Sequence, residues 1–346
     1  MKLLLLLAAS AGLSSAAVLK QIRDESPAPS RMLRRQYVAP TTNLTDGDIL
    51  NYALTLEHLE DTFYRTGLAN FTEADFTKAG YNGSFYNNLK MISSDETTHV
   101  SFLTSALKAA NVTPVAACNY SFPVTDPKTF LATASALEGV GVSAYLGAAA
   151  DIMNKTYLTA AASILTTESR HSAYIRAQLD ESPFASPFDV PLDPDEVYTL
   201  AAAFIKSCPM SNPALPVKAF PSLTYKNTSS SPALSNSTAT FMTNASSSAN
   251  GTVYGAFITV TGPIIVPAQA VSGGFSLMVP ANVSGQSYVV LTDSNMTVSD
   301  DTITAGPAII EVNNPSSPKT SWSHNNIMGR LTTKEHETSR PAQSLI

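Results

Sequence analysis

Features that would indicate a nucleic-acid or membrane partner are missing from this 346-residue sequence. It has no basic run with interleaved aromatic residues, which disfavours nucleic-acid binding. Beyond the first residues, no apolar stretch approaches the length of a transmembrane helix, so no membrane span is expected. The C-terminal residues are polar and charged, whereas a lipid-anchor signal ends in an apolar tail, so that anchor is not expected either.

Cysteine is also scarce, because only Cys118 and Cys208 are present. In an oxidising compartment two lone cysteines most often pair, so we expect a disulfide between them; two free buried thiols are the alternative. Such a disulfide would tie the segment after the second predicted helix to the end of the fifth.

The N-terminal residues predict secretion. Residues 1–17, MKLLLLLAASAGLSSAA, combine a basic residue, a Leu/Ala-rich run and small residues, as a secretory signal peptide does; a buried helix is the alternative. The polar segment 18–35 ends in Arg34-Arg35, which indicates propeptide cleavage, with a solvated basic patch as the alternative. We therefore expect an extracellular protein, in the medium or in a cell wall.

Potential glycosylation sites support the same location. Twelve Asn-x-Ser/Thr sequons occur, and their density after a signal peptide is typical of a glycosylated extracellular protein. The asparagines are Asn43, Asn70, Asn82, Asn111, Asn119, Asn154, Asn227, Asn236, Asn244, Asn250, Asn282 and Asn295.

The composition changes sharply near residue 210, from Ala, Leu and Glu with helical periodicity to Pro, Ser, Thr, Val and Gly. This change predicts an α+β multidomain chain. We expect a helical region over 45–208, a Ser/Thr/Asn-rich linker over 209–252, a small β-sandwich-like domain over 253–313 and a disordered tail over 314–346. The stretch 227–250 within the linker is alternatively an elaborated loop.

Four long helices and a short fifth are expected in the helical region, and four long helices of this kind predict a four-helix bundle. The first begins at Thr45 or Asp46 and is predicted to end at Gly67, with the glycine as a left-handed cap. The others are expected over about 84–110, 126–153, 156–180 and from Asp193-Pro194 to just before Cys208.

Two of the five histidines follow a glutamate by three residues, in Glu96-x-x-His99 and Glu168-x-x-His171. Residues at this spacing face the same side of a helix, so each pair offers a carboxylate and an imidazole to one point. Metal sites inside helical bundles use this spacing.

The other two long helices each contribute a glutamate, Glu57 and Glu138. Each is followed seven residues later by a tyrosine, Tyr64 and Tyr145, on the same stripe of the helix. We expect the tyrosines to pack in the core; the alternatives are that their hydroxyls hydrogen-bond to a ligand carboxylate or that the rings receive a radical.

An ionised carboxylate buried among the apolar neighbours of Glu57 or Glu138 would cost several kcal/mol without a partner. Four carboxylates around two divalent cations would instead be neutralised. Four carboxylates and two imidazoles form a hard, oxygen-rich set that suits iron or manganese, and zinc is less expected without thiolates. We therefore predict two Fe or Mn ions, with a structural polar network as the alternative.

Glu60 competes with Glu57 for the ligand role, because it lies nearer the centre of the apolar stripe. The two halves of the helical region match each other, however, and the counterpart of Glu60 is Gly141, which has no side chain. Glu57 is therefore kept as the ligand and Glu60 as a residue supporting the ligands. His58 is expected to face solvent, and His324 and His336 in the tail are expected to have no role.

The four helical motifs resemble the ferritin-like superfamily of di-iron carboxylate proteins. Within it, LEHLEDTFY, DETTHVSFL, LEGVGVSAYLGAA and TTESRHSAYIRAQL are similar to the secreted fungal ferritin-like-domain family, which includes stress-response and sexual-development proteins and is related to desiccation-associated proteins. The resemblance covers 45–208. It implies a ferritin-like four-helix bundle with ligands at Glu57, Glu96, His99, Glu138, Glu168 and His171.

This resemblance does not define a reaction, so two candidate functions remain open. The first is a stress-related redox enzyme, a di-iron or di-manganese oxidoreductase that detoxifies peroxide or metal. The second is a non-catalytic extracellular glycoprotein with the bundle as a scaffold and with cell-wall or surface contacts. Iron storage in a shell is the least favoured, because the glycans and the appended β-rich domain would obstruct cage contacts. The oligomeric state is not indicated.

Overall fold

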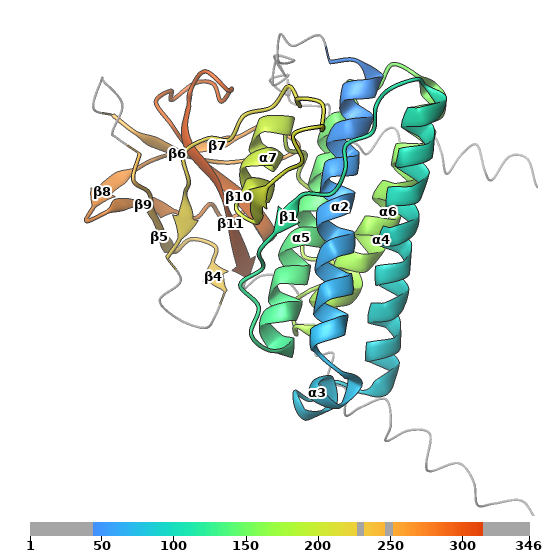
Figure 1. Ribbon diagram of the computed structural model, residues 1–346. Helices are drawn as coiled ribbons and strands as arrows, with labels where there is room; N and C mark the ends of the chain where they lie inside the picture. The colour runs from blue at the N-terminus through green and yellow to red at the C-terminus, as the bar shows by residue number, and fades with distance from the viewer. Residues whose placement is uncertain (1–43, 227–231, 246–251, 314–346) are drawn as a thin grey trace, which may run out of the picture. The chain divides into compact units, whose positions relative to one another are not determined.

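The structure is a computed structural model that describes residues 44–226, 232–245 and 252–313 (Figure 1). The predicted signal peptide 1–17, propeptide 18–35 and tail 314–346 lie outside the described residues, as do His324 and His336. Among the described residues, no helix combines the length and the apolar character that a bilayer crossing requires.

Four long helices dominate the N-terminal half. They are α2 (Asp46–Asn70), α4 (Gly83–Ala109), α5 (Pro127–Ala148) and α6 (Lys155–Gln178). Helix α2 packs against α4, α5 packs against α6, and α2 and α5 contact each other (Figure 1). A side-chain oxygen caps the first turn of each helix, because the first backbone N–H groups have no partner within the helix; the capping residues are Thr45, Asn82, Asp126 and Asn154.

The prediction that α2 ends at Gly67 is wrong, because the helix continues to Asn70. Gly67 is not a left-handed cap but a contact point, since a Cβ there would lie 2.1 Å from the ring of Phe130. The short helix α3 (Glu73–Lys78) was not expected. Its start is marked by a capping box between Thr72 and Asp75, in which each side chain pairs with the other residue's backbone.

The fifth predicted helix is α7 (Pro194–Ala202), capped by Asp193 and shorter than expected. After it the chain enters β2 (Ile205–Ser207), which pairs with β1 (Asn119–Tyr120). The structure joins Cys118 and Cys208 in a disulfide beside this pair, across 90 residues of sequence. The bond therefore holds the chain on either side of α5, α6 and α7.

Two sheets form the β-rich part. The five-stranded sheet has the order β4-β11-β10-β6-β7, and the four-stranded sheet has the order β3-β5-β9-β8. Apolar side chains of both sheets, including Phe241, Phe257, Leu277 and Val289, form one buried cluster. The bounds are β3 Thr224–Tyr225, β4 Ala233–Leu234, β5 Thr238–Met242, β6 Tyr254–Phe257, β7 Ile264–Pro267, β8 Gln269–Val271, β9 Gly274–Met278, β10 Gly285–Thr292 and β11 Ile303–Asn313.

The α+β class is confirmed, but the predicted linker over 209–252 needs correction, because β3, β4 and β5 lie within it. The β5 sequence TATFM alternates so that Ala239 and Phe241 are buried, which is the period-2 pattern of a half-buried strand. The richness of this segment in Ser, Thr and Asn concealed that alternation. The β-rich part therefore begins near residue 224 rather than 253.

The β-rich part packs directly on α5 and α6. The Tyr288 hydroxyl of β10 donates a hydrogen bond to the Gly139 carbonyl oxygen of α5 at 2.8 Å. Arg176 of α6 binds both carboxylate oxygens of Glu311 in β11, at 2.9 and 2.7 Å. These contacts fix α5 and α6, which carry half of the candidate site.

Candidate metal centre

The six predicted ligands converge on one buried region between the four long helices. Helix α2 supplies Glu57, α4 supplies Glu96 and His99, α5 supplies Glu138, and α6 supplies Glu168 and His171. The four carboxylate residues are at most 1% exposed. Glu57 and Glu138 lie on the same faces as the apolar side chains that α2 and α5 bury, so their carboxylates point into the interior.

Their donor atoms form two overlapping groups, each with all atoms within 4.8 Å of one another. One group contains Glu57, Glu96, His99 and Glu168, and the other contains Glu96, Glu138, Glu168 and His171. Glu96 and Glu168 belong to both groups. Each group adds one glutamate and one histidine of its own, so the arrangement has two halves that share two carboxylates.

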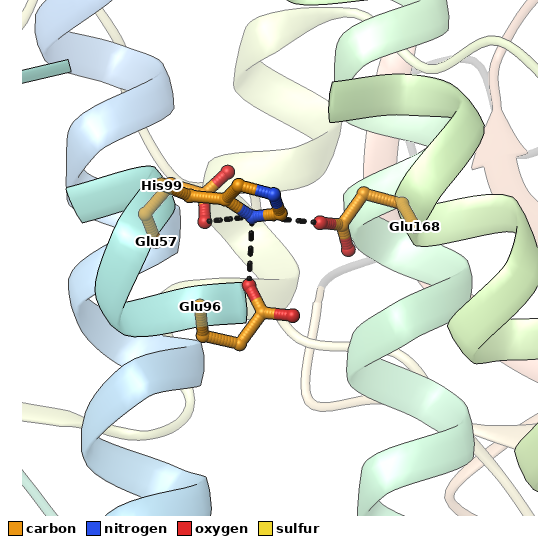
Figure 2. Close-up of side chains that lie close together, drawn as sticks. All are labelled: Glu57, Glu96, His99 and Glu168. Atoms are coloured by element: carbon orange, nitrogen blue, oxygen red, sulfur yellow. Dashed lines mark hydrogen bonds and ion pairs between the residues drawn. The ribbon is translucent and has the colours of Figure 1, made fainter. Parts of the chain in front are cut away.

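The Nδ1 atom of His99 lies at the centre of the first group. It is 3.2 Å from a Glu57 oxygen, 3.1 Å from a Glu96 oxygen and 3.3 Å from a Glu168 oxygen (Figure 2). Figure 2 shows these three carboxylates directed at the ring from three sides. These contacts are hydrogen bonds and ion pairs.

His171 occupies the matching position in the second group. Its Nδ1 lies 2.9 Å from a Glu96 oxygen and 3.4 Å from a Glu138 oxygen. Its other ring nitrogen, Nε2, lies 3.2 Å from Asp95 Oδ2. A carboxylate on the far nitrogen fixes the orientation of a histidine ligand. Sequence reasoning missed Asp95, although its position next to Glu96 was the available signal.

Both predicted tyrosines are buried and both hydrogen-bond to ligand carboxylates. The Tyr145 hydroxyl donates to Glu57 at 2.5 Å, and the Tyr64 hydroxyl donates to Glu138. Each tyrosine therefore serves the glutamate of the other helix rather than the glutamate on its own stripe. These crossed bonds link α2 to α5 and restrict how the two carboxylates rotate.

Glu60 lies beside the ligands but outside both donor groups. Its side chain is 4% exposed. Gly141 of α5 lies next to it, because a Cβ at that position would be 3.0 Å from Glu60 Oε1 and 2.9 Å from Glu168 Oε2. The expectation for His58 is wrong. Its ring is half-buried, with Nε2 3.1 Å from the Val115 carbonyl oxygen, because the segment after α4 covers that face of α2.

Burial and mutual repulsion set the protonation of the cluster. Burial raises the pKa of Glu60 and of Glu168 well above the usual range, and neighbouring glutamates raise both further. Burial also raises the pKa of Glu96, to about 7, although hydrogen bonds from His171 and His99 oppose it. The metal-free cluster therefore retains protons at neutral pH.

The pKa values of the two histidines are raised, so the imidazoles can carry positive charge beside the carboxylates. Burial lowers the pKa of His99, but hydrogen bonds to Glu168, Glu57 and Glu96 outweigh it and raise the pKa to about 12. For His171, contacts with Glu138 and Glu96 likewise outweigh burial and raise the pKa to about 11. In the protein without bound metal, these raised pKa values would keep both imidazoles protonated among the carboxylates.

The donor set fits a pair of divalent cations. Buried oxygens of Glu96, Glu138 and Glu168 and the Nδ1 atom of His171 have no hydrogen-bond partner of good geometry among the described residues. Buried polar atoms are rarely left in this state unless an ion or water satisfies them. Carboxylate oxygens with a minority of imidazoles are the ligands that iron and manganese prefer.

Comparisons with known proteins agree with this geometry. Residues 45–181 match the family model for the ferritin-like domain. The chain is 25% identical over 178 residues to Protein rds1 of Schizosaccharomyces pombe (strain 972 / ATCC 24843), a match that covers 51% of this chain and 44% of that relative. The segment 45–181 holds all four long helices and all six clustered side chains. The helical part of this chain is therefore similar to the ferritin-like domain, and it holds a candidate carboxylate and histidine metal site.

Proposed function

We propose that the four long helices act as a ferritin-like bundle that binds two iron or manganese ions through Glu57, Glu96, His99, Glu138, Glu168 and His171. The observation that carries this proposal is the sharing of Glu96 and Glu168 by two donor groups. Two cations bound to shared carboxylates would lie close together, and four carboxylates would balance their four positive charges.

We further propose a secreted, stress-related protein that removes peroxide or captures reactive metal. Two adjacent iron or manganese ions supply two-electron redox chemistry when bound. The residues of the chain would hold the ions and orient the ligand side chains. The tyrosine hydroxyls fix Glu57 and Glu138, and Asp95 orients His171. The predicted N-terminal signal peptide and the Cys118–Cys208 disulfide support secretion, because disulfides persist in oxidising compartments.

Elemental analysis of the secreted protein tests the ligand set. We expect two equivalents of iron or manganese in the wild type and almost none in Glu168→Ala, because Glu168 belongs to both donor groups. Glu57→Ala removes a donor from one group alone, so it should retain more metal than Glu168→Ala. Glu73→Ala, on the surface of α3, is the control and should keep two equivalents. Unchanged stoichiometry in Glu168→Ala contradicts the assignment.

Turnover separates the two functions. Peroxide consumption that is lost in Glu138→Ala supports the redox function. Metal binding without turnover supports a scaffold protein of the cell wall or surface, in which the metals stabilise the helices. One observation favours this second function: all nine sequon asparagines within the described residues are exposed, so glycans at these sites would cover much of the surface.

A further inference from the structure

An apolar cavity of about 320 Å³ lies against α2 and α5, on the side of the cluster that faces the β-rich part. Its inner walls are aliphatic side chains of the two helices, including Leu56, Leu59 and Val140. Leu200 and Phe204 from α7 and the residues after it close one side. The β-rich part supplies the remaining wall through Tyr225 of β3 and Ile309 of β11.

The inner end of this cavity reaches the candidate metal centre at Glu60 and Gly141. A Cβ on residue 141 would lie 2.9 Å from the ligand oxygen Glu168 Oε2 and 3.0 Å from Glu60 Oε1. Gly141, which has no side chain, therefore lines the cavity at a point close to both carboxylates, of which Glu60 belongs to the lining. The matching position on α2 is Glu60 itself, so the two halves of the helical part differ where the cavity meets the cluster.

Glu60 is the charged side chain in this lining. It is 96% buried, and no described residue forms a hydrogen bond with it. A buried carboxyl group without a partner is costly, so a ligand that satisfied Glu60 would be stabilised. The rest of the wall offers few polar partners, and ordered water needs two to four of them, which disfavours a cavity filled by water alone.

We propose that this cavity binds an uncharged apolar alcohol or phenol, with its hydroxyl group at Glu60 and its carbon skeleton between α2, α5 and the β-rich part. A hydroxyl both donates and accepts, so it pairs with Glu60 in either protonation state. At the packing density of a protein interior, the volume holds about a dozen carbon atoms. This inference rests on the proposed function, because it names the class of substrate that lies beside the metal centre.

The proposal gives the β-rich part a role in the site. Without β3 and β11 the cavity would open to solvent on that side, and the apolar walls of α2 and α5 would be exposed. A ligand bound there would be shielded from water while its hydroxyl lay at Glu60. The absence of a basic side chain in the lining disfavours anionic ligands, which the clustered carboxylates would repel.

Equilibrium dialysis with naphthalene derivatives tests the ligand class on the full-length, metal-analysed protein. We expect 1-naphthol to bind about tenfold or more tightly than 1-methylnaphthalene, which has no hydrogen-bonding group, and 1-naphthoate to bind weakest. Glu60→Met should abolish the preference for 1-naphthol. Equal binding of the two neutral probes to the wild type, or a preference that persists in Glu60→Met, overturns the assignment of the hydroxyl to Glu60.

A second pair of variants tests the location. Ala203 is exposed at the end of α7 and lines the cavity, so Ala203→Trp should lower 1-naphthol affinity about tenfold or more by filling it. Ala150→Trp, at an exposed alanine just after α5, is the matched control and should bind like the wild type. Unchanged affinity in Ala203→Trp overturns the cavity as the binding site, and a folded Leu200→Trp variant serves if Ala203→Trp does not fold.

The metal content measured on the same samples distinguishes this inference from the proposed function. If the protein carries no metal but binds 1-naphthol in a way that Ala203→Trp abolishes, the cavity stands and the metal function fails. If two equivalents of metal are present and 1-naphthol does not bind, the cavity proposal fails and the metal function stands.

Discussion

At the scale of single residues, the central feature is a cluster of buried glutamate carboxyl groups. Glu57, Glu60, Glu96, Glu138 and Glu168 are all buried within one region, and two histidines face them. Such a cluster folds only if protons or cations neutralise it, because each uncompensated buried charge costs several kcal/mol. In the metal-free protein the raised pKa values of Glu60, Glu96, Glu168 and the two imidazoles mean that these groups hold protons. Metal binding must displace them.

The first prediction concerns this exchange of protons for metal. The metal-free folded protein binds more protons than the unfolded chain, because the pKa of Glu96 is raised from 4.5 to about 7 and those of His99 and His171 from 6.5 to about 12 and 11. The stability of the metal-free protein should therefore fall as the pH rises from about 5 to 8. The affinity for metal should rise over the same range, because ligands bind metal in their deprotonated form.

Differential scanning calorimetry at several pH values checks this prediction. The difference in Tm between metal-loaded and metal-free protein should widen from pH 5 to pH 8. The matched control is Glu168→Ala, in which metal addition should change Tm little at any pH. A difference in Tm that is constant or that narrows with increasing pH contradicts the proposed displacement of protons.

The second prediction concerns the crossed tyrosines. Tyr145→Phe removes the hydroxyl that donates to Glu57 and leaves the ring in place. Groups behind metal ligands change affinity by about 10- to 100-fold, so we expect the affinity for metal to fall about tenfold. Tyr157→Phe in α6 is the control, because Tyr157 is half-buried near Tyr145 but outside the donor groups. Competition with a chelator measures both; equal affinities would show that the Tyr145 hydroxyl has no role in holding the ligand.

The residues of the cluster were predictable for a physical reason, and their partners were not. Two Glu-x-x-His pairs place both side chains on one helix face wherever the helix lies. The choice of Glu138 as the partner of Tyr64, and of Asp95 as the partner of His171, depends on which helices are neighbours and how they are rotated. His58 was misassigned because the chain after α4 folds back over α2, which local periodicity does not report.

At the scale of elements, the tight approaches to α5 depend on its glycines. Gly147 lies where the segment before α7 crosses the helix, and a Cβ there would lie 1.7 Å from the Leu192 carbonyl oxygen. The backbone N–H of Leu192 donates to the Ser143 carbonyl at 3.2 Å, which holds the crossing in place. Because the backbone at Leu192 is held in this way, its carbonyl oxygen cannot move away from a side chain at position 147.

The third prediction compares two glycines of this helix. Gly147→Ala should lower the free energy of unfolding by about 3 kcal/mol, because overpacking against fixed backbone outweighs the gain in helix propensity. Gly139→Ala is the matched control. Its Cβ would meet the side-chain amide of Gln286, which can move aside if it gives up its hydrogen bonds to Ala136 and Tyr288, so we expect a smaller loss of about 1–2 kcal/mol. Urea denaturation measures both, and similar values for the two variants would contradict the fixed crossing at Leu192.

Strand prediction failed at this scale for a related reason. The segment 209–252 was expected to be a linker because Ser, Thr and Asn dominate it, yet β5 buries Ala239 and Phe241 against the second sheet. Short strands bury few residues, so the composition of the exposed face obscures the pattern. The helices were predictable because each presents its period over many turns and begins at a recognisable cap, such as Asp126-Pro127.

At the scale of the whole molecule, the helical and β-rich parts share one core. Tyr288 and Val290 of β10 belong to the same buried cluster as Phe130 and Leu137 of α5. Arg176 adds an ionic link, since it is 7% exposed and binds Glu311, and its Nε donates to the Ser182 carbonyl. We therefore expect the described parts of the chain to unfold together.

The fourth prediction tests the ionic link. Arg176→Met leaves the carboxylates of Glu311 and Glu181 without their cation, and removing one partner of a buried ion pair costs about 3–5 kcal/mol. Lys78→Met is the control, because Lys78 and Asp75 form an exposed pair 3.9 Å apart, and such pairs contribute about 0–1 kcal/mol. Urea unfolding followed both by far-ultraviolet circular dichroism and by tyrosine fluorescence should give coincident transitions in the wild type and a lower midpoint in Arg176→Met. A midpoint that shifts no more in Arg176→Met than in Lys78→Met would mean that the shared apolar core, rather than Arg176, joins the two parts.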